Sequence, residues 1–164
     1  LSSFFFSFSN SFFFVLLFFL CISNQSFPAE RTVSGWVEYI RIKELNIKYK
    51  ALIDTGAEYC TLHAYKIKMQ KRGDKYFVSF LTSNAEGNYS EATLPVNKKI
   101  EILSSNGTSQ IRFAVMLTIT LGKVTKTVIA TLANRRHSMP VIIGRNFLKD
   151  RFLVNPEKQF LFGR

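Results

Sequence analysis

One acidic side chain stands at the point where an apolar strand should end. Residues 51–57 read ALIDTGA, so Asp54 follows three apolar residues and precedes Thr55 and Gly56. A carboxylate at the edge of a core is costly unless it is solvated, paired or shared. Gly56 permits a sharp turn and the close approach of a ligand, and the Thr55 hydroxyl can both donate and accept. Asp54 is therefore a candidate catalytic carboxylate, and an ordinary Asx-type turn is the alternative.

Few other groups in the chain could do chemistry. A catalytic thiol at Cys60 would need a histidine partner, yet His63 and His137 lie in no thiol-protease signature. A small buried hydrophobe is the other interpretation of Cys60. Catalytic zinc needs three protein ligands and an open position, but no H-E-x-x-H is present, and Cys60 with His63 would supply only half a site. We therefore predict no metal and no cofactor, with His63 in or beside a strand.

Alternating apolar residues predict that strands position Asp54. Apolar side chains recur at every second place in several runs, which is the period of a half-buried strand. The clearest runs are 45–53, 63–69 and 111–119, and the β-branched stretch is 124–132.

Turn signals separate these strands and leave room for a single helix. Gly-containing turns are predicted at 72–74, 86–88 and 121–123, and Asn106-Gly107 predicts a hairpin. Only 146–152 has a helical pattern, with Asn146 as a reasonable cap. The chain is therefore predicted to be all-β with one short late helix.

Charge divides the chain into two parts. Residues 1–29 contain no charged residue and hold 10 of the 17 Phe, and 12–22 is an unbroken apolar run. Such a run suits a signal peptide and is short for a spanning helix of about 20 residues. We expect cleavage within 23–29 and a periplasmic or secreted protein. An uncleaved membrane anchor over 4–22 is the alternative, since no Lys or Arg precedes the run. Residues 30–164 then form one domain.

A second motif gives the Asp54 segment its context. Residues 141–148 read VIIGRNFL, and with the DTGA segment they resemble the retropepsins, the single-domain aspartic peptidases of retroviruses. The chain is more similar still to the small bacterial retropepsin-like aspartic peptidases often labelled ATP-dependent zinc proteases. The additional shared residues are Gly35, Trp36, the LHA of 62–64, the SSNG of 104–107 and the RFLV of 151–154.

The resemblance covers about residues 33–163 and implies the retropepsin-like acid-protease fold, a small closed β-barrel-like domain with one short C-terminal helix. The chain departs from the family at Cys60, where a small residue such as Ser is common, and at Asn155, where Asp is common. The sequence supports neither ATP nor zinc as a cofactor, because it lacks both the H-E-x-x-H zinc motif and a G-x-x-x-x-G-K-[ST] loop for ATP.

The resemblance also implies a mechanism. Two facing carboxylates can share one proton, so that one acts as base and the other as acid on a water attacking an amide. This chain has a single Asp-Thr-Gly, so the second Asp54 would come from another copy in a homodimer. Thr55, Gly56 and Ala57 would support the loop. Arg145 would pair with Glu58 beside it, or would be a solvated cation at the helix start.

The net charge of +11 bears on partners. A basic surface attracts polyanions, but no nucleic-acid motif is present, so we expect no specific nucleic acid. Some bacterial relatives accompany ligases that add glutamate tails, which implies an acidic peptide or protein substrate. Alternatively, the lysines only keep strand faces and turns in contact with water.

We predict a homodimeric aspartic endopeptidase. The alternative is an inactive retropepsin-like domain that binds a peptide or polyanion. We expect contact with a membrane only if the N-terminal segment is not cleaved.

Overall fold

A computed structural model describes residues 30–103, 107, 109–135 and 139–163. The predicted leader at 1–29 and His137 lie outside the described residues. The elements are β1 (Thr32–Ile42), β2 (Ile47–Ile53), β3 (Cys60–His63), β4 (Tyr65–Arg72), β5 (Lys75–Ser83), β6 (Tyr89–Pro95), β7 (Lys98–Leu103), β8 (Ser109–Leu121), β9 (Val124–Ala133), β10 (Val141–Ile143), α2 (Arg145–Leu148) and β11 (Phe152–Gln159).

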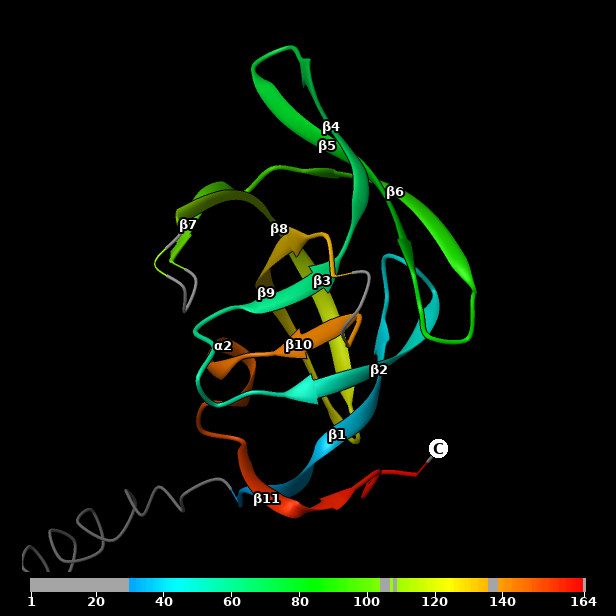
Figure 1. The fold of residues 1–164 in the computed structure, drawn as a ribbon, viewed down its shortest axis with the longest axis vertical. Coiled ribbons are helices and arrows are strands. Elements are labelled where there is room, and N and C mark those ends of the chain that lie inside the picture. Colours follow the sequence, from blue (N-terminus) through cyan, green and yellow to red (C-terminus); the bar gives the residue numbers. More distant parts are fainter. Residues whose placement is uncertain (1–29, 104–106, 108, 136–138, 164) are drawn as a thin grey trace, which may run out of the picture. The chain divides into compact units, whose positions relative to one another are not determined.

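The strands form a closed barrel with a second small sheet beside it (Figure 1). The larger sheet has the order β11-β1-β2-β10-β3-β9-β8-β7, and β1 also pairs with β8, which closes the ring. The smaller sheet has the order β4-β5-β6. The prediction of an all-β retropepsin-like fold with one short late helix is confirmed.

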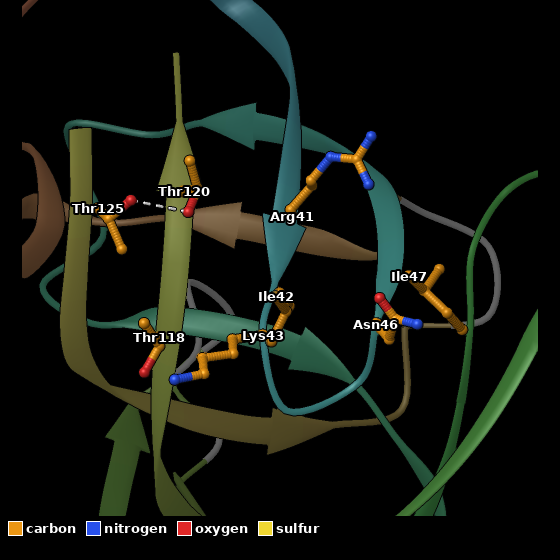
Figure 2. Close-up of a pocket in the computed structure, with 8 residues that line it drawn as sticks. All are labelled: Arg41, Ile42, Lys43, Asn46, Ile47, Thr118, Thr120 and Thr125. Atoms are coloured by element: carbon orange, nitrogen blue, oxygen red, sulfur yellow. Dashed lines mark hydrogen bonds between the residues drawn. The ribbon is translucent and has the colours of Figure 1, made fainter. Parts of the chain in front are cut away.

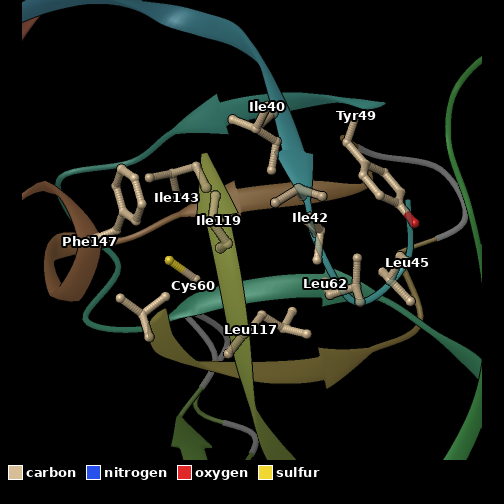
Figure 3. Close-up of a cluster of buried hydrophobic side chains, with 14 of the residues drawn as sticks. Ile40, Ile42, Leu45, Tyr49, Cys60, Leu62, Leu117, Ile119, Ile143 and Phe147 are labelled. Atoms are coloured by element: carbon tan, nitrogen blue, oxygen red, sulfur yellow. The ribbon is translucent and has the colours of Figure 1, made fainter. Parts of the chain in front are cut away.

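The alternating residues of the sequence fill the barrel. On β2, Tyr49, Ala51 and Ile53 are buried, and Leu117 and Ile119 of β8 are buried opposite them. Figure 3 shows Tyr49, Leu117 and Ile119 in one cluster with side chains of β1, β3, β10 and α2. Burial of large apolar side chains, at about 1.5–3 kcal/mol each, is the main term that stabilises such a core.

Two local expectations were wrong. The alternation over 63–69 is not one strand, because β3 ends at His63 and β4 begins at Tyr65 in a different sheet. As a result Met69, which the pattern assigned to the core, is 45% exposed. The helix spans only Arg145–Leu148, and its N-cap is Gly144 rather than Asn146.

The predicted turns have the expected places in the chain. Residues 72–74, 86–88 and 121–123 connect β4 to β5, β5 to β6 and β8 to β9. Strands β7 and β8 pair up to Leu103 and Ser109, which confirms a hairpin here, while Asn106 of the predicted turn lies outside the described residues. In the part of the chain that the structure describes, no helix is long and apolar enough to cross a membrane.

Candidate active site

Two parallel strands bring the two sequence motifs together. β10 runs parallel to β2, with Val141 opposite Ala51 and Ile143 opposite Ile53. Parallel strands end at the same edge of a sheet, so the loop after β2 and the turn after β10 lie side by side. The Asp54 backbone N–H donates to the Ile143 carbonyl oxygen at 3.0 Å. Residues 89 positions apart therefore build one site.

The Asp54 carboxylate is oriented by its own loop. The backbone N–H groups of Gly56 and Ala57 donate to Asp54 Oδ1 at 2.8 and 3.2 Å. Among the described residues, Oδ2 has no hydrogen-bond partner. One oxygen is thus fixed by the backbone, and the other is left to bind water or a second carboxylic acid.

The Arg145 side chain binds the backbone of the Asp54 loop. Its Nη1 donates to the carbonyl oxygens of Thr55 and Gly56 at 2.9 and 2.7 Å. Arg145 is therefore at the loop, as the resemblance implied, but its partners differ from the predicted one. In the described part of the chain the guanidinium bonds these two carbonyl oxygens rather than the Glu58 carboxylate. The reason is geometric: the turn after Asp54 directs two successive carbonyl groups toward the start of α2.

The loop and the helix start are also joined by Asn146, which sequence reasoning treated only as a cap. Its Oδ1 accepts from the Cys60 backbone N–H at 3.0 Å, and its Nδ2 donates to the Ile129 carbonyl at 2.7 Å. The Arg145 and Asn146 backbone N–H groups donate to the Ala57 and Glu58 carbonyl oxygens. Asn146 thus connects β3 to β9 through its side chain and contacts the loop through its backbone.

Gly144 makes this approach possible. A Cβ at this position would lie 2.7 Å from the carbonyl carbon and oxygen of Tyr59 and 3.0 Å from the carbonyl oxygen of Ala57. These are backbone atoms, which cannot move aside as a flexible side chain would. The Gly-Arg-Asn motif therefore matches the loop in three ways. Gly144 leaves room for the loop backbone, the Arg145 guanidinium binds loop carbonyl oxygens, and the Asn146 side-chain amide binds the Cys60 backbone N–H where the loop ends.

Cys60 is buried inside this arrangement. Its thiol is a free cysteine whose Sγ lies 3.3 Å from Asn146 Oδ1. Burial raises the pKa of the Cys60 thiol to about 11. A thiol with a raised pKa is a poor nucleophile near neutral pH, which favours the interpretation of Cys60 as a packing residue.

A cleft of about 530 Å³ opens beside the loop. Its lining includes the residues that follow Thr55 in the loop, β7 and the start of β8. The lining residues are Gly56, Ala57, Glu58, Tyr59, Thr61, Ile100, Glu101, Ile102, Leu103, Arg112, Thr131, Arg135 and Ile142. A space of this size can hold several residues of an extended peptide.

Two arginines that sequence reasoning missed line the cleft. Burial lowers the pKa of Arg112 and of Arg135 from the usual value, and the positive charge of Arg112 lowers the pKa of Arg135 further. Asp54 acts in the opposite direction on the pKa of Arg135, so the carboxylate is close enough to influence this guanidinium. Arg112 and Arg135 lie 23 positions apart on different elements, and no local pattern marks them as partners.

His63 supports one of these arginines. Its Nδ1 accepts a hydrogen bond from the Arg135 backbone N–H at 2.9 Å, and Arg135 Nε donates to the Met139 carbonyl at 3.0 Å. Burial lowers the pKa of His63, a hydrogen bond to the Ala133 backbone opposes this, and Arg135 adds to it. His63 therefore acts as a buried acceptor at the end of β3, where the sequence placed it.

Metal-binding groups do not cluster in the described structure. Nowhere in the described ranges do three His, Cys, Asp or Glu side chains lie close enough to hold a metal ion.

A second hollow, of about 290 Å³, lies at the β1–β2 turn against β8 and β9. Figure 2 shows the Thr120 and Thr125 hydroxyls hydrogen-bonded to each other on one side, with Arg41 and Lys43 pointing apart. It shares no lining residue with the cleft. Its cations do not converge on a common point, so we assign no function to it.

Comparison with known proteins gives the family. The model of the RimB-like family, retropepsin-like aspartic endopeptidase RimB, matches residues 33–164. The chain belongs to the RimB-like family. Within this family match, Asp54 and Gly144–Asn146 are the residues that the structure brings to one loop.

Curated relatives are longer proteins. The chain is 28% identical over 138 residues to a probable alpha-L-glutamate ligase of Desulfotalea psychrophila, which covers 81% of this chain and 30% of the relative. It is 32% identical over 119 residues to a probable alpha-L-glutamate ligase of Shewanella pealeana, covering 70% of this chain and 26% of the relative. The chain thus spans less than a third of the length of these relatives.

A solved structure shares the RimB-like fold. The crystal structure of a Legionella pneumophila protein of unknown function (DUF785) matches with a TM-score of 0.70 and 25% sequence identity. The match covers 81% of this chain and 99% of the Legionella chain.

Proposed function

We propose that this RimB-like chain is one protomer of a homodimeric aspartic endopeptidase, in which two Asp54 side chains activate a water molecule. The observation that supports the proposal best is the state of the Asp54 carboxylate. Its Oδ1 accepts two backbone N–H groups of its own loop, while Oδ2 is left for water or a second carboxyl. Membership of a family of aspartic endopeptidases supports the same chemistry.

The reaction needs an acid and a base, and one carboxyl cannot be both at once. Two carboxyls in contact share a single proton, because like charges so close cannot both ionise. The ionised Asp54 takes a proton from water, and the resulting hydroxide attacks the scissile carbonyl carbon. The protonated Asp54 hydrogen-bonds the carbonyl oxygen as the tetrahedral intermediate forms. A proton then passes to the leaving amide nitrogen, and the C–N bond breaks.

The homodimer follows from this need. The described chain carries one Asp-Thr-Gly segment, so the second carboxyl belongs to another copy on a two-fold axis. Arg145 keeps Thr55 and Gly56 in place, so that two loops of fixed shape can meet across that axis.

The substrate that fits the cleft is an acidic peptide or protein. Arg112 and Arg135 line the cleft beside the loop, and both guanidinium groups are partly buried, where their interaction with a carboxylate is less screened by water. Glu58 and Glu101 also line it and would repel some acidic side chains. Relatives named probable alpha-L-glutamate ligases make glutamate-containing chains a natural first substrate to test.

The experiment compares a glutamate-rich peptide with a glutamine-rich peptide of the same length and reads cleavage by mass spectrometry. We expect cleavage of the acidic peptide, no cleavage by Asp54→Asn, and unchanged thermal unfolding in this nearly isosteric variant. Heterodimers of wild-type and Asp54→Asn chains, isolated with two different affinity tags, should be inactive, and activity per chain should fall on dilution. An active monomer or an active heterodimer would place the chemistry elsewhere. Peptide binding without any cleavage by the wild type would favour the inactive binding domain.

Arg112→Gln and Arg135→Gln test the substrate separately from the mechanism. Each should lower kcat/KM for the glutamate-rich peptide and leave kcat/KM for the glutamine-rich peptide nearly unchanged. Loss of one charge-assisted hydrogen bond, about 1.5–3 kcal/mol, corresponds to a decrease of roughly 10- to 100-fold. Equal losses on both peptides would assign the arginines a structural role.

A further inference from the structure

The hairpin of β4 and β5 extends away from the barrel (Figure 1). In the described structure β4 pairs with β5 alone and forms the edge of the small sheet. Every residue from 68 to 76 is exposed, so this outer half contributes nothing to the buried core. Two-stranded ribbons are at best marginally stable alone, so a ribbon that projects without burying apolar surface is a candidate for contact with a partner.

Positive charge gathers on this hairpin. The cations are Lys66, Lys68, Lys71, Arg72 and Lys75. The acidic residue within the same stretch is Asp74 in the turn, and Glu91 on β6 lies at the inner end of the small sheet. The hairpin therefore has an excess of positive charge that its own carboxylates do not balance.

The strand register sorts these side chains onto two faces. Lys68 is opposite Ser79, and Arg72 is opposite Lys75. Directly opposite residues of antiparallel strands project to the same side. This side is the solvent face, because the alternate residues Val78 and Phe80 are buried on the other side.

Hydrogen bonds order the solvent face. Ser79 Oγ lies 2.8 Å from Thr93 Oγ1, and Gln70 Nε2 donates to Ser79 Oγ at 3.4 Å. Arg72 Nη2 donates to Gln70 Oε1 at 3.2 Å, and its guanidinium lies 5.3 Å from the centre of the Phe77 ring. The cation is thus held above the sheet by a polar chain and an aromatic ring, so less side-chain freedom is lost when it binds.

We propose that the solvent face of the β4–β5 hairpin binds the phosphate backbone of double-helical nucleic acid without reading its sequence. Arg, Lys, Ser, Thr and Gln side chains are the groups that commonly contact phosphate oxygens, and here they share one face. A two-stranded ribbon also fits the major groove of a B-form duplex, which is about 12 Å wide. Arg72, Gln70 and Ser79 are hydrogen-bonded to one another on this face, so we expect binding to depend on charge rather than on contacts with base edges.

Edge-strand lysines can also serve only to prevent sheets from pairing edge to edge. That role requires charge along the strand but no ordered chain of hydroxyl, amide and guanidinium groups across the face. The two roles differ in a measurable way, because phosphate binding is reduced by salt in proportion to the number of contacts.

The experiment measures binding of the purified protein to a fluorescein-labelled 25-base-pair DNA duplex by anisotropy over a series of salt concentrations. The test variant is Lys68→Gln/Arg72→Gln/Lys75→Gln. The matched control is Lys123→Gln/Lys149→Gln/Lys158→Gln, which removes the same charge from exposed side chains on other elements. We expect the slope of log K against log salt to decrease in magnitude by about 2–3 in the test variant, at about 0.9 per lost phosphate contact. The control should keep the wild-type slope, and two unrelated duplex sequences should bind alike.

Several outcomes would overturn the proposal. Equal losses in both variants would mean that net charge alone attracts the duplex. Binding of poly-L-glutamate that decreases in the test variant, with no duplex binding, would assign the hairpin to the acidic substrate. A change of molecular mass in the test variant would make the hairpin a contact between copies. Thermal unfolding and peptide cleavage by the test variant should match the wild type, so failure here leaves the proposed peptidase untouched.

Discussion

Replacement of Arg145 by Met gives the most direct test of how the Asp54 loop is held. Met keeps much of the length and apolar volume of the side chain but removes the donor to Thr55 and Gly56. The two hydrogen bonds, at 2.9 and 2.7 Å, are short and charge-assisted. Such bonds contribute about 1.5–3 kcal/mol each when protected from water.

Arg145 is exposed, so water replaces part of what is lost. We therefore expect a total decrease of about 1–3 kcal/mol in the free energy of unfolding. For a folded part of this size that corresponds to a fall in Tm of roughly 3–10 °C. Peptidase activity should fall further than stability does, because a displaced loop misplaces the Asp54 carboxylate.

A double-mutant cycle with Glu58→Gln separates the two candidate partners of Arg145. If the carbonyl oxygens are the partners, Glu58→Gln alone should change stability by less than about 0.5 kcal/mol, and the coupling energy should be near zero. Unfolding by urea at a fixed protein concentration measures the stability of all four proteins, and light scattering reports whether the proposed dimer is present in each. A coupling energy of about 1 kcal/mol or more would refute the carbonyl assignment and restore the ion pair that the family resemblance implied.

Three further predictions concern the residues around the loop. Gly144→Ala should destabilise the protein by about 1–3 kcal/mol or more in urea unfolding, because its Cβ would meet the backbone of Tyr59; unchanged stability would mean that the loop can shift. The pKa of His63 is lowered in the folded protein, so just below pH 6.5 the unfolded chain binds a proton that the folded chain does not bind. The free energy of unfolding should therefore decrease as the pH falls through this range. His63→Asn should make this pH dependence less steep, and an equally steep curve in the variant would assign it to other groups. The Cys60 thiol has a pKa of about 11 instead of 9.0, so it should react with iodoacetamide at pH 8 about 100-fold more slowly than a free thiol. Peptide mapping measures this rate, and rapid modification would mean that β3 is accessible.

The barrel could be predicted from the sequence because its strands are half buried. On β2 and β8 the period of two in apolar residues is the same period that separates core from solvent. The pattern failed over 63–69, where Met69 continues the alternation but projects on an edge strand outside the barrel. Alternation reports that a strand has two different faces, and it does not report whether a core exists opposite the apolar one.

The site could be predicted in part for a similar reason. Asp54 and Arg145 lie in short motifs, and their meeting follows from two parallel strands that end together. The partners of Arg145 are backbone carbonyl groups, whose directions are set by the path of the loop and not by residue type. Arg112 and Arg135 are brought to one cleft only by the register of β8 and the turn after β9, so their shared position depends on tertiary structure.

The carbonyl partners of Arg145 have a consequence for working conditions. The dyad that we propose shares one proton, and acid that supplies this proton would also tend to neutralise a carboxylate partner of Arg145 and so release the guanidinium. Carbonyl oxygens do not titrate in this range, and an arginine stays charged throughout it. The hydrogen bonds from Arg145 to the loop are therefore independent of the proton that the proposed reaction needs. If the proposed pair of Asp54 carboxyls forms, it can take up its shared proton in acid without loosening the loop that aligns it.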